Sequence, residues 1–488
     1  MKMVKSLILG SAAGLLAMGG AQAADLPVKA KAVEYVRICS LYGAGFFYIP
    51  GTDTCVKLGG YLRADLAVNG SDFSAFYSGA GGQFNRTRNE FVTRARETLD
   101  IDTRTATEYG VLRTFANLNF SWTTGDAIGG SSVGVYHAFI QFAGFTMGRT
   151  ISIFDAPWVN YPANNFDSLV GGSGAVTGTN QFAYTAQFGN GVSASVAAQD
   201  QTAYYQTNIW NTSGGSNANF AQGVLGGQSI GGQIAPDLVG MVRVDQAWGL
   251  FQASVAAHDN HTSYYTPSNE TSGHPTDKWG WAGQLSLSIK NIPTGPGDTI
   301  NIQGAYANGA SRYVFHSLVP TAFAMYSNSG IPANYQSLGT GSVSDATFAG
   351  VTATAGSQLE LTTTYGFRGG YTHNWNPNWD TSLYGAWAAV RYSGNAKANI
   401  CAPIGIVPSV VGGATACNPD FNIWQIGTKT GWTPVKGLTF SGDVVYSQLN
   451  QKNVGSISPG AIGTKPALAY DFKDQNTWTF LARAQRNW

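Results

Sequence analysis

The feature that most constrains this chain is a two-residue alternation of apolar and polar side chains. In residues 56–69, Leu58, Leu62 and Leu66 share one face with other apolar residues, and more polar positions alternate with them. Residues 478–488 alternate in the same way. A β-strand turns successive side chains to opposite faces, so this pattern predicts strands with one apolar and one polar face.

Segments of this kind recur along the whole chain and predict sixteen strands. Seven tight connections alternate with eight long ones, which predicts short turns at one rim and long loops at the other. An even number of strands with this asymmetry is typical of a bacterial transmembrane β-barrel. The predicted strands begin near residues 56, 89, 110, 133, 145, 180, 192, 237, 250, 279, 298, 358, 380, 421, 437 and 477.

The composition suits strands that face lipid on one side. Only 11% of the residues are charged, against roughly 25% in soluble domains. In hydrocarbon, strands can span only as a closed barrel, because an open sheet leaves backbone groups unpaired. A secreted β-sandwich would also alternate. It is disfavoured because the polar faces carry charge, which suits a wet lumen, and because an aromatic residue ends the chain.

The N-terminus has the features of a secretory signal peptide. Two lysines precede a twelve-residue apolar stretch, and Ala21-Gln22-Ala23 forms an A-x-A cleavage site. We therefore predict a signal peptide over residues 1–23. Residues 24–55 are expected to form an N-terminal periplasmic segment with one cysteine pair, and residues 56–488 to form the barrel.

The four cysteines are expected to form disulfides, because export favours oxidation. Cys39 and Cys55 are 16 residues apart, as are Cys401 and Cys417, and three connectivities are open. Pairing within each neighbouring couple closes the shortest loops. Free or metal-binding thiols are the alternative, although no CxxC motif supports a metal site.

Three segments resemble a known family. Residues 39–63 read CSLYGAGFFYIPGTDTCVKLGGYLR and follow ADLPVKA at residues 24–30, and residues 148–155 read GRTISIFD. Together with the terminal Trp488, these segments resemble the general outer-membrane porins of alphaproteobacteria of the Rhizobiales type. The family usually ends in Phe rather than Trp.

The resemblance implies an all-β, sixteen-stranded antiparallel transmembrane barrel with long external loops, usually assembled as a homotrimer. It also implies that loop 3, here the connection over residues 154–179, folds into the lumen. Asp155 and Asp167 would then be acids of the constriction. Without the resemblance, an external loop with solvated acids is equally compatible with these residues.

Five cations occupy positions that the alternation assigns to the inward face of three consecutive predicted strands. They are Lys57, Arg63, Arg94, Arg96 and Arg113, and they predict a basic wall along the pore. Charges in the lumen tune selectivity, whereas charges facing lipid are costly. The alternative is a general lumen lining in which acids on the same strands balance the cations, namely Asp65, Asp100 and Asp102.

Two further features leave alternatives open. The two-residue alternation places Arg149 on the lipid side with Met147 and Ile151, which indicates either a bulge or a subunit contact. Residues 308–357 are rich in Gly, Ser, Thr and Ala and are predicted to form a surface loop.

No catalytic site is indicated. The chain has no P-loop, HExxH or GxSxG motif, and its six histidines are scattered. We expect no catalytic residue, no metal and no cofactor. The net charge of +1 gives no sign of nucleic-acid binding.

These observations predict an outer-membrane porin, not an enzyme, for passive diffusion of ions and small hydrophilic solutes. The alternatives are a substrate-selective channel, for example for a sugar, and a surface adhesin or structural barrel. The expected partners are outer-membrane lipid, lipopolysaccharide, small solutes and two further copies of the chain.

Overall fold

The computed structural model describes residues 37–69, 85–127, 131–167, 169–174, 176–202, 204–404, 406–407 and 416–488. The predicted signal peptide lies outside the described residues.

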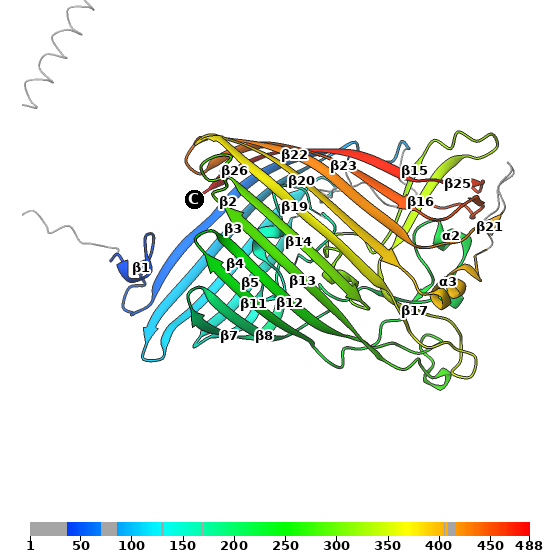
Figure 1. Ribbon diagram of the computed structural model, residues 1–488, viewed down its shortest axis with the longest axis horizontal. Coiled ribbons are helices and arrows are strands. Elements are labelled where there is room, and N and C mark those ends of the chain that lie inside the picture. Colours follow the sequence, from blue (N-terminus) through cyan, green and yellow to red (C-terminus); the bar gives the residue numbers. More distant parts are fainter. Residues whose placement is uncertain are drawn as a thin grey trace, which may run out of the picture.

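Sixteen strands form one closed antiparallel barrel (Figure 1). Each strand pairs with its neighbour in the chain, and the first and last pair with each other, so that Tyr61 lies opposite Asn487 and Val68 opposite Phe480. The predicted sixteen-stranded barrel is therefore confirmed. The strands are β2 (Cys55–Val68), β3 (Phe91–Thr107), β4 (Gly110–Thr123), β5 (Ser132–Phe142), β6 (Phe145–Thr150), β7 (Thr179–Gly189), β8 (Val192–Gln199), β11 (Asp237–Gln246), β12 (Gly249–Asn260), β13 (Lys278–Lys290), β14 (Thr299–Asn308), β19 (Thr363–Asn376), β20 (Trp379–Arg391), β22 (Phe421–Val435), β23 (Leu438–Gln451) and β26 (Gln475–Asn487).

The alternation in the sequence locates most strand starts to within two residues. The exception is the strand expected near residue 358, because β19 begins at Thr363. The intervening Glu360–Leu361 forms a separate short strand, β18, which pairs with a loop strand instead of the barrel wall.

Apolar side chains cover the outside of the barrel, as the alternation requires. Leu62, Val255 and Phe367 are each more than half exposed, whereas the inward Gln252 and Ser286 are buried. Among the described residues, no helix is long and apolar enough to cross a membrane.

Tight turns connect neighbouring strands at one end of the barrel. At the β7–β8 turn, Asn190 and Gly191 both have positive φ, 48° and 72°. A two-residue turn of this kind matches the twist of the flanking strands, and Asn and Gly adopt it at low cost.

The opposite end carries the long loops, which form two small sheets and short helices (Figure 1). One sheet joins β9, β10, β17 and β18, and the other joins β15, β16, β21, β24 and β25. The loop elements are η2 (Pro157–Val159), β9 (Asn208–Asn211), η3 (Thr212–Gly214), α2 (Asn217–Phe220), β10 (Gly227–Gln228), η4 (Glu270–Ser272), η5 (Ser311–Tyr313), β15 (Ala322–Ser327), β16 (Gln336–Ser342), β17 (Ser344–Phe348), β18 (Glu360–Leu361), α3 (Gly394–Cys401), β21 (Ile406–Val407), β24 (Ser456–Ile457) and β25 (Tyr470–Phe472).

The segment 308–357 differs from the predicted surface loop. Tyr313, Phe315, Phe323 and Phe348 are all fully or almost fully buried. The low charge of this segment reflects packing against other loops, so its interior is an apolar core instead of a solvated surface.

The turn end carries the N-terminal segment, with η1 (Ser40–Tyr42) and β1 (Phe47–Tyr48), which pairs with β2. Disulfides join Cys39 to Cys55 and Cys401 to Cys417, which is the local pairing expected from the spacing.

A charge on the lipid-facing side should destabilise the barrel. Val255 lies on the outward face of β12 and is 63% exposed. We expect Val255→Arg to lower the free energy of unfolding in lipid vesicles by about 2–4 kcal/mol, the cost of a cation near the bilayer midplane. Urea titration followed by Trp fluorescence measures this. The inward Gln485→Arg is the control, and equal stability of the two variants would contradict the assigned faces.

Candidate functional site

Loop 3 connects β6 to β7 over residues 151–178, and its described residues lie inside the barrel and are hydrogen-bonded to the wall. The Nε2 atom of Gln252 on β12 lies 3.0–3.2 Å from the carbonyl oxygens of residues 153–155. The backbone N–H of Val170 donates to Gln425 on β22 over 2.9 Å. The inward-folded loop is therefore observed, and inward amides of the wall satisfy its backbone.

A buried arginine fixes the far end of loop 3. Arg368 on β19 is 1% exposed. Its guanidinium donates to the carbonyls of Leu169 and Ser173 and to Oε1 of Gln303. Gly171 has φ +86°, and a Cβ there would lie 2.2 Å from the carbonyl oxygen of Phe367. The close approach of the loop to β19 therefore requires glycine.

Aromatic packing fills the space between loop 3 and the external loops. The ring of Tyr313 lies 4.4 Å from that of Phe154 and is stacked on that of Tyr205 at 4.3 Å. All three side chains are almost completely buried. The lumen beside β12, β14 and β19 is thus occupied by protein.

A buried charged cluster ties these loops to the wall. Nδ1 of His258 lies 2.8 Å from Asp237 Oδ1, and Nε2 lies 3.5 Å from Asp345 Oδ2. The Tyr313 hydroxyl donates to Asp237 Oδ2 over 2.6 Å. Asp345 also accepts from the backbone N–H of Thr207. This cluster therefore connects β11, β12 and two external loops.

On the opposite wall, three arginines surround one carboxylate. Asp65 lies directly opposite Arg94 on β3 and Arg483 on β26 in the strand register. Its oxygens lie 3.2 Å from Arg63, 2.9 Å from Arg94 and 2.7 Å from Arg483. We call these four residues the Asp65 cluster. The buried Asp65 carboxylate thus holds the three guanidinium groups in place through these ion pairs.

Loop 3 presents an acid to this cluster. The Tyr161 hydroxyl donates to Asp167 Oδ1 over 2.6 Å. The same loop contacts the cluster directly, because Nη2 of Arg483 donates to the carbonyl of Asn165 over 3.5 Å. The narrowed lumen here has an acid on one side and guanidinium groups on the other.

Asp155 does not share this position, contrary to the expectation for the two loop acids. It is 3% exposed and accepts a hydrogen bond of 3.3 Å from Tyr205. Its charge acts on Arg368, which holds the loop. The apolar residues on either side of Asp155 pack into the aromatic layer and bury the carboxylate with them.

The other predicted cations lie along the same wall toward the turn end. Nε of Arg96 donates to Ser121 Oγ over 2.7 Å. Arg113 forms two 3.0 Å hydrogen bonds to Asp102, which also pairs with Arg104. Lys57 lies opposite Asp102 in the register.

Sequence reasoning missed Arg104 and Arg483. Arg104 has the same parity as Arg94 and Arg96 on β3, so the alternation could have identified it. Arg483 lies on the inward face of the last strand, and only closure of the barrel brings it beside Asp65.

Arg149 has the outward parity that the alternation predicted. It lies opposite Ala138 and Asn180 in an unbroken register, so no bulge occurs at this residue. Its Nε donates to the carbonyl of Thr177 over 3.2 Å.

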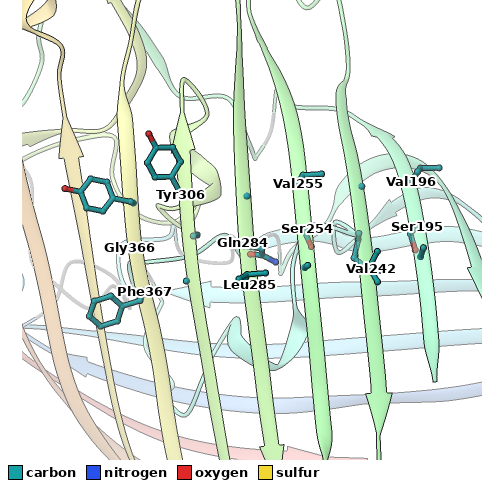
Figure 2. A pocket seen from close by; sticks show the side chains of 18 of the residues that line it. Ser195, Val196, Val242, Ser254, Val255, Gln284, Leu285, Tyr306, Gly366 and Phe367 are labelled. Atoms are coloured by element: carbon teal, nitrogen blue, oxygen red, sulfur yellow. The ribbon is translucent and has the colours of Figure 1, made fainter. Parts of the chain in front are cut away.

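The outer surface of the barrel carries an apolar groove of about 960 Å³. Small residues such as Gly240, Gly283 and Gly304 alternate there with bulky ones and leave a hollow. Because this groove faces lipid, hydrocarbon chains can fill it. Figure 2 shows its bulky residues Val196, Val242, Val255, Leu285, Tyr306 and Phe367 on neighbouring strands.

Comparison with known proteins identifies the family. A family profile described as the porin subfamily matches residues 25–481. The chain belongs to the porin subfamily. This porin is an outer-membrane β-barrel, as the resemblance at its N-terminus implied.

Curated relatives match part of the porin. Porin Omp2b of Brucella suis is 37% identical over 269 residues, which are 53% of this chain and 66% of the relative. Porin Omp2b of Brucella abortus strain 2308 is 36% identical over 267 residues, with the same two shares. The matched region therefore spans slightly less than two thirds of these relatives.

A solved structure supports the fold. The outer membrane channel DcaP of Acinetobacter baumannii superposes with a TM-score of 0.56 and 14% identity, covering 90% of this chain and 99% of that chain. At this identity the similarity shows the fold alone.

Removing the central acid of the Asp65 cluster should change the ion preference of the porin. Asp65→Asn adds one unit of positive charge beside Arg63, Arg94 and Arg483. We expect the reversal potential in a salt gradient across a planar bilayer to shift toward greater anion preference. Asp126→Asn, at the external end of β4, is the control. An unchanged reversal potential in Asp65→Asn would place the cluster outside the conduction path.

Proposed function

We propose that this porin forms a water-filled channel for passive diffusion of ions and small hydrophilic solutes across the outer membrane. The observation that carries the proposal is a closed barrel whose inward face is polar and whose lumen is narrowed by loop 3. Barrels of 16–18 strands are wide enough to hold an aqueous channel.

The passage follows β2, β3, β4 and β26. On the other side, loop 3 and the external loops pack against the wall through Gln252, Arg368 and Gln425. A polar cavity of about 600 Å³ adjoins loop 3, and its lining includes Gln141, Gln181 and Asp245. This cavity supports a hydrated vestibule on the periplasmic side of the constriction.

The passage carries an excess of positive charge. Seven inward cations on β2, β3, β4 and β26 face three inward carboxylates on these strands and Asp167 on loop 3. The difference, seven minus four, is three positive charges. This supports the predicted basic wall and a preference for anions, since charge at a constriction sets ion preference. The cations are Lys57, Arg63, Arg94, Arg96, Arg104, Arg113 and Arg483.

The N-terminal segment is proposed to form part of the periplasmic rim. β1 pairs with the turn end of β2, and the disulfide between Cys39 and Cys55 closes the segment onto the wall. Phe46 lies beneath the cations Lys57 and Arg104 at 5.9 and 4.8 Å. These contacts support a position of the segment next to the exit of the passage.

The porin is further proposed to assemble as a homotrimer through the outward face of β3. Glu97 points to the lipid side between Leu62 and Phe120 in the register. Within the described part of the chain, no hydrogen bond or ion pair to its carboxylate is found. Arg149 on β6 carries the opposite charge on the same outer surface. A ring of copies needs head-to-tail contacts between two different patches, which would bring such charges together.

The trimer is tested at Glu97. If this side faced lipid, Glu97→Leu would stabilise the protein. If it contacts a second copy, we expect Glu97→Leu to lower the temperature at which trimers dissociate on SDS gels. Thr428→Leu, on the outward face of β22, is the control. Trimers of unchanged or greater stability in Glu97→Leu would refute this interface.

The channel itself is tested at the basic wall. We expect the wild-type protein to form stable conducting channels in planar bilayers. The triple variant Arg94→Ser, Arg96→Ser, Arg113→Ser should lose anion preference and conduct more, because the guanidinium groups occupy the passage. Arg486→Ser, on the outward face, is the control. Absence of conductance in the wild type would refute the channel, and an unaltered triple variant would refute the wall.

A further inference from the structure

We propose that the basic wall is a track with a preference for small aromatic carboxylates. The proposal rests on the channel function proposed above and names the solutes that the channel favours. Its basis is a repeated pairing, in which inward cations of this wall lie against aromatic rings that also line the lumen.

The first pairing is called the upper pairing because it lies nearer the external loops. Its cation, Arg96, is two residues from Arg94 of the Asp65 cluster along β3. The guanidinium carbon of Arg96 lies 5.7 Å from the centre of the Tyr136 ring. Nε of Arg96 donates to Ser121, and the described residues supply no hydrogen-bond partner for its two terminal nitrogens. The planar donor edge of this guanidinium is therefore available to a carboxylate, which it can bind through two parallel hydrogen bonds.

The second pairing, called the lower pairing, lies nearer the turn end and contains two rings. The guanidinium carbon of Arg113 lies 5.2 Å from the Phe115 ring centre and 5.5 Å from that of Phe139. The two phenyl rings are 5.4 Å apart. Arg113 and Arg104 share the single carboxylate of Asp102, and both side chains are more than a quarter exposed. One positive charge is thus left over, next to an aromatic surface.

This chemistry distinguishes between classes of solute. An inorganic anion uses only the guanidinium groups, and a neutral sugar needs hydrogen-bond partners that phenyl rings lack. An aromatic carboxylate uses both features, because its ring contacts Phe115 or Phe139 while its oxygens approach Arg113.

The spacing of the two pairings suits passage better than tight binding. The cations Arg96 and Arg104 are eight residues apart on β3, about 27 Å at the rise of an extended strand, whereas Tyr136 and Phe139 are three residues apart on β5, about 10 Å. A small solute can therefore move from the ring of one pairing to a ring of the next. Successive weak sites allow a solute to enter and also to leave.

The opposite wall provides a contrast. Arg243 also lies over a ring, at 5.0 Å from that of Trp158 on loop 3. Asp245 lies 3.7 Å from Arg243 and balances its charge. A surplus cation combined with inward aromatic rings is thus a property of the wall formed by β2–β5.

The test compares benzoate with cyclohexanecarboxylate, which has the same charge and similar size but no aromatic face. Each is added to single channels that carry a chloride current in a planar bilayer. We expect benzoate to reduce the current saturably, at a concentration at least five-fold lower than cyclohexanecarboxylate. The double variant Phe115→Leu, Phe139→Leu should lose this difference.

The matched control is Phe145→Leu, Phe182→Leu. These rings are 6.0 Å apart, like the lumenal pair, but lie on the outward face. This control should keep the five-fold difference. Tyr136→Leu, which tests the upper pairing independently of the phenyl rings, should reduce it.

Two results would overturn the proposal. One is equal action of benzoate and cyclohexanecarboxylate on the wild-type current. The other is a difference that survives in both the double Leu variant and Tyr136→Leu. In either case the chloride current itself still reports the channel, whereas failure of the proposed channel function would appear as no current before any carboxylate is added.

Discussion

A segment that leaves the wall of a barrel and enters its lumen loses the hydrogen bonds of the sheet, so other groups must satisfy its backbone. In this porin the wall supplies them. Gln252, Gln425 and Arg368 reach inward from three strands and bind peptide groups of loop 3. These three contacts hold the loop against β12, β19 and β22, and Asn165 of the loop also bonds to Asp443 on β23 and to Arg483 on β26. The remaining passage therefore lies along the wall that carries the Asp65 cluster.

The confined passage explains why so many arginines can lie close together. The Asp65 carboxylate forms ion pairs with Arg63, Arg94 and Arg483 in the middle of the wall. The Asp102 carboxylate pairs with arginines in the same way nearer the turn end. Each carboxylate reduces the repulsion between its guanidinium groups without cancelling their charge. The remaining field acts across a narrow space beside low-dielectric protein, where charges are screened less than in bulk water.

Much of this architecture follows from the two-residue alternation, which locates the strands and predicts that Arg94, Arg96 and Arg113 point inward. Contacts made by closure or by loops could not be predicted in the same way. Arg483 meets Asp65 across 418 residues of sequence. Asp155 is an ordinary loop acid in the sequence, and only the packing of Tyr205 against loop 3 shows that it is buried. Pairing rules act along strands, whereas no comparable period governs the loops.

The central claim is that one side of the lumen is open and the other is filled. Thiol accessibility tests it directly, since all four native cysteines are in disulfides. Asn117 is half-buried on the inward face of β4, and Ser286 on β13 is 1% exposed. An anionic methanethiosulfonate should modify Asn117→Cys and reduce the single-channel current, and should leave Ser286→Cys unmodified. Modification of Ser286→Cys at the same rate would contradict the account.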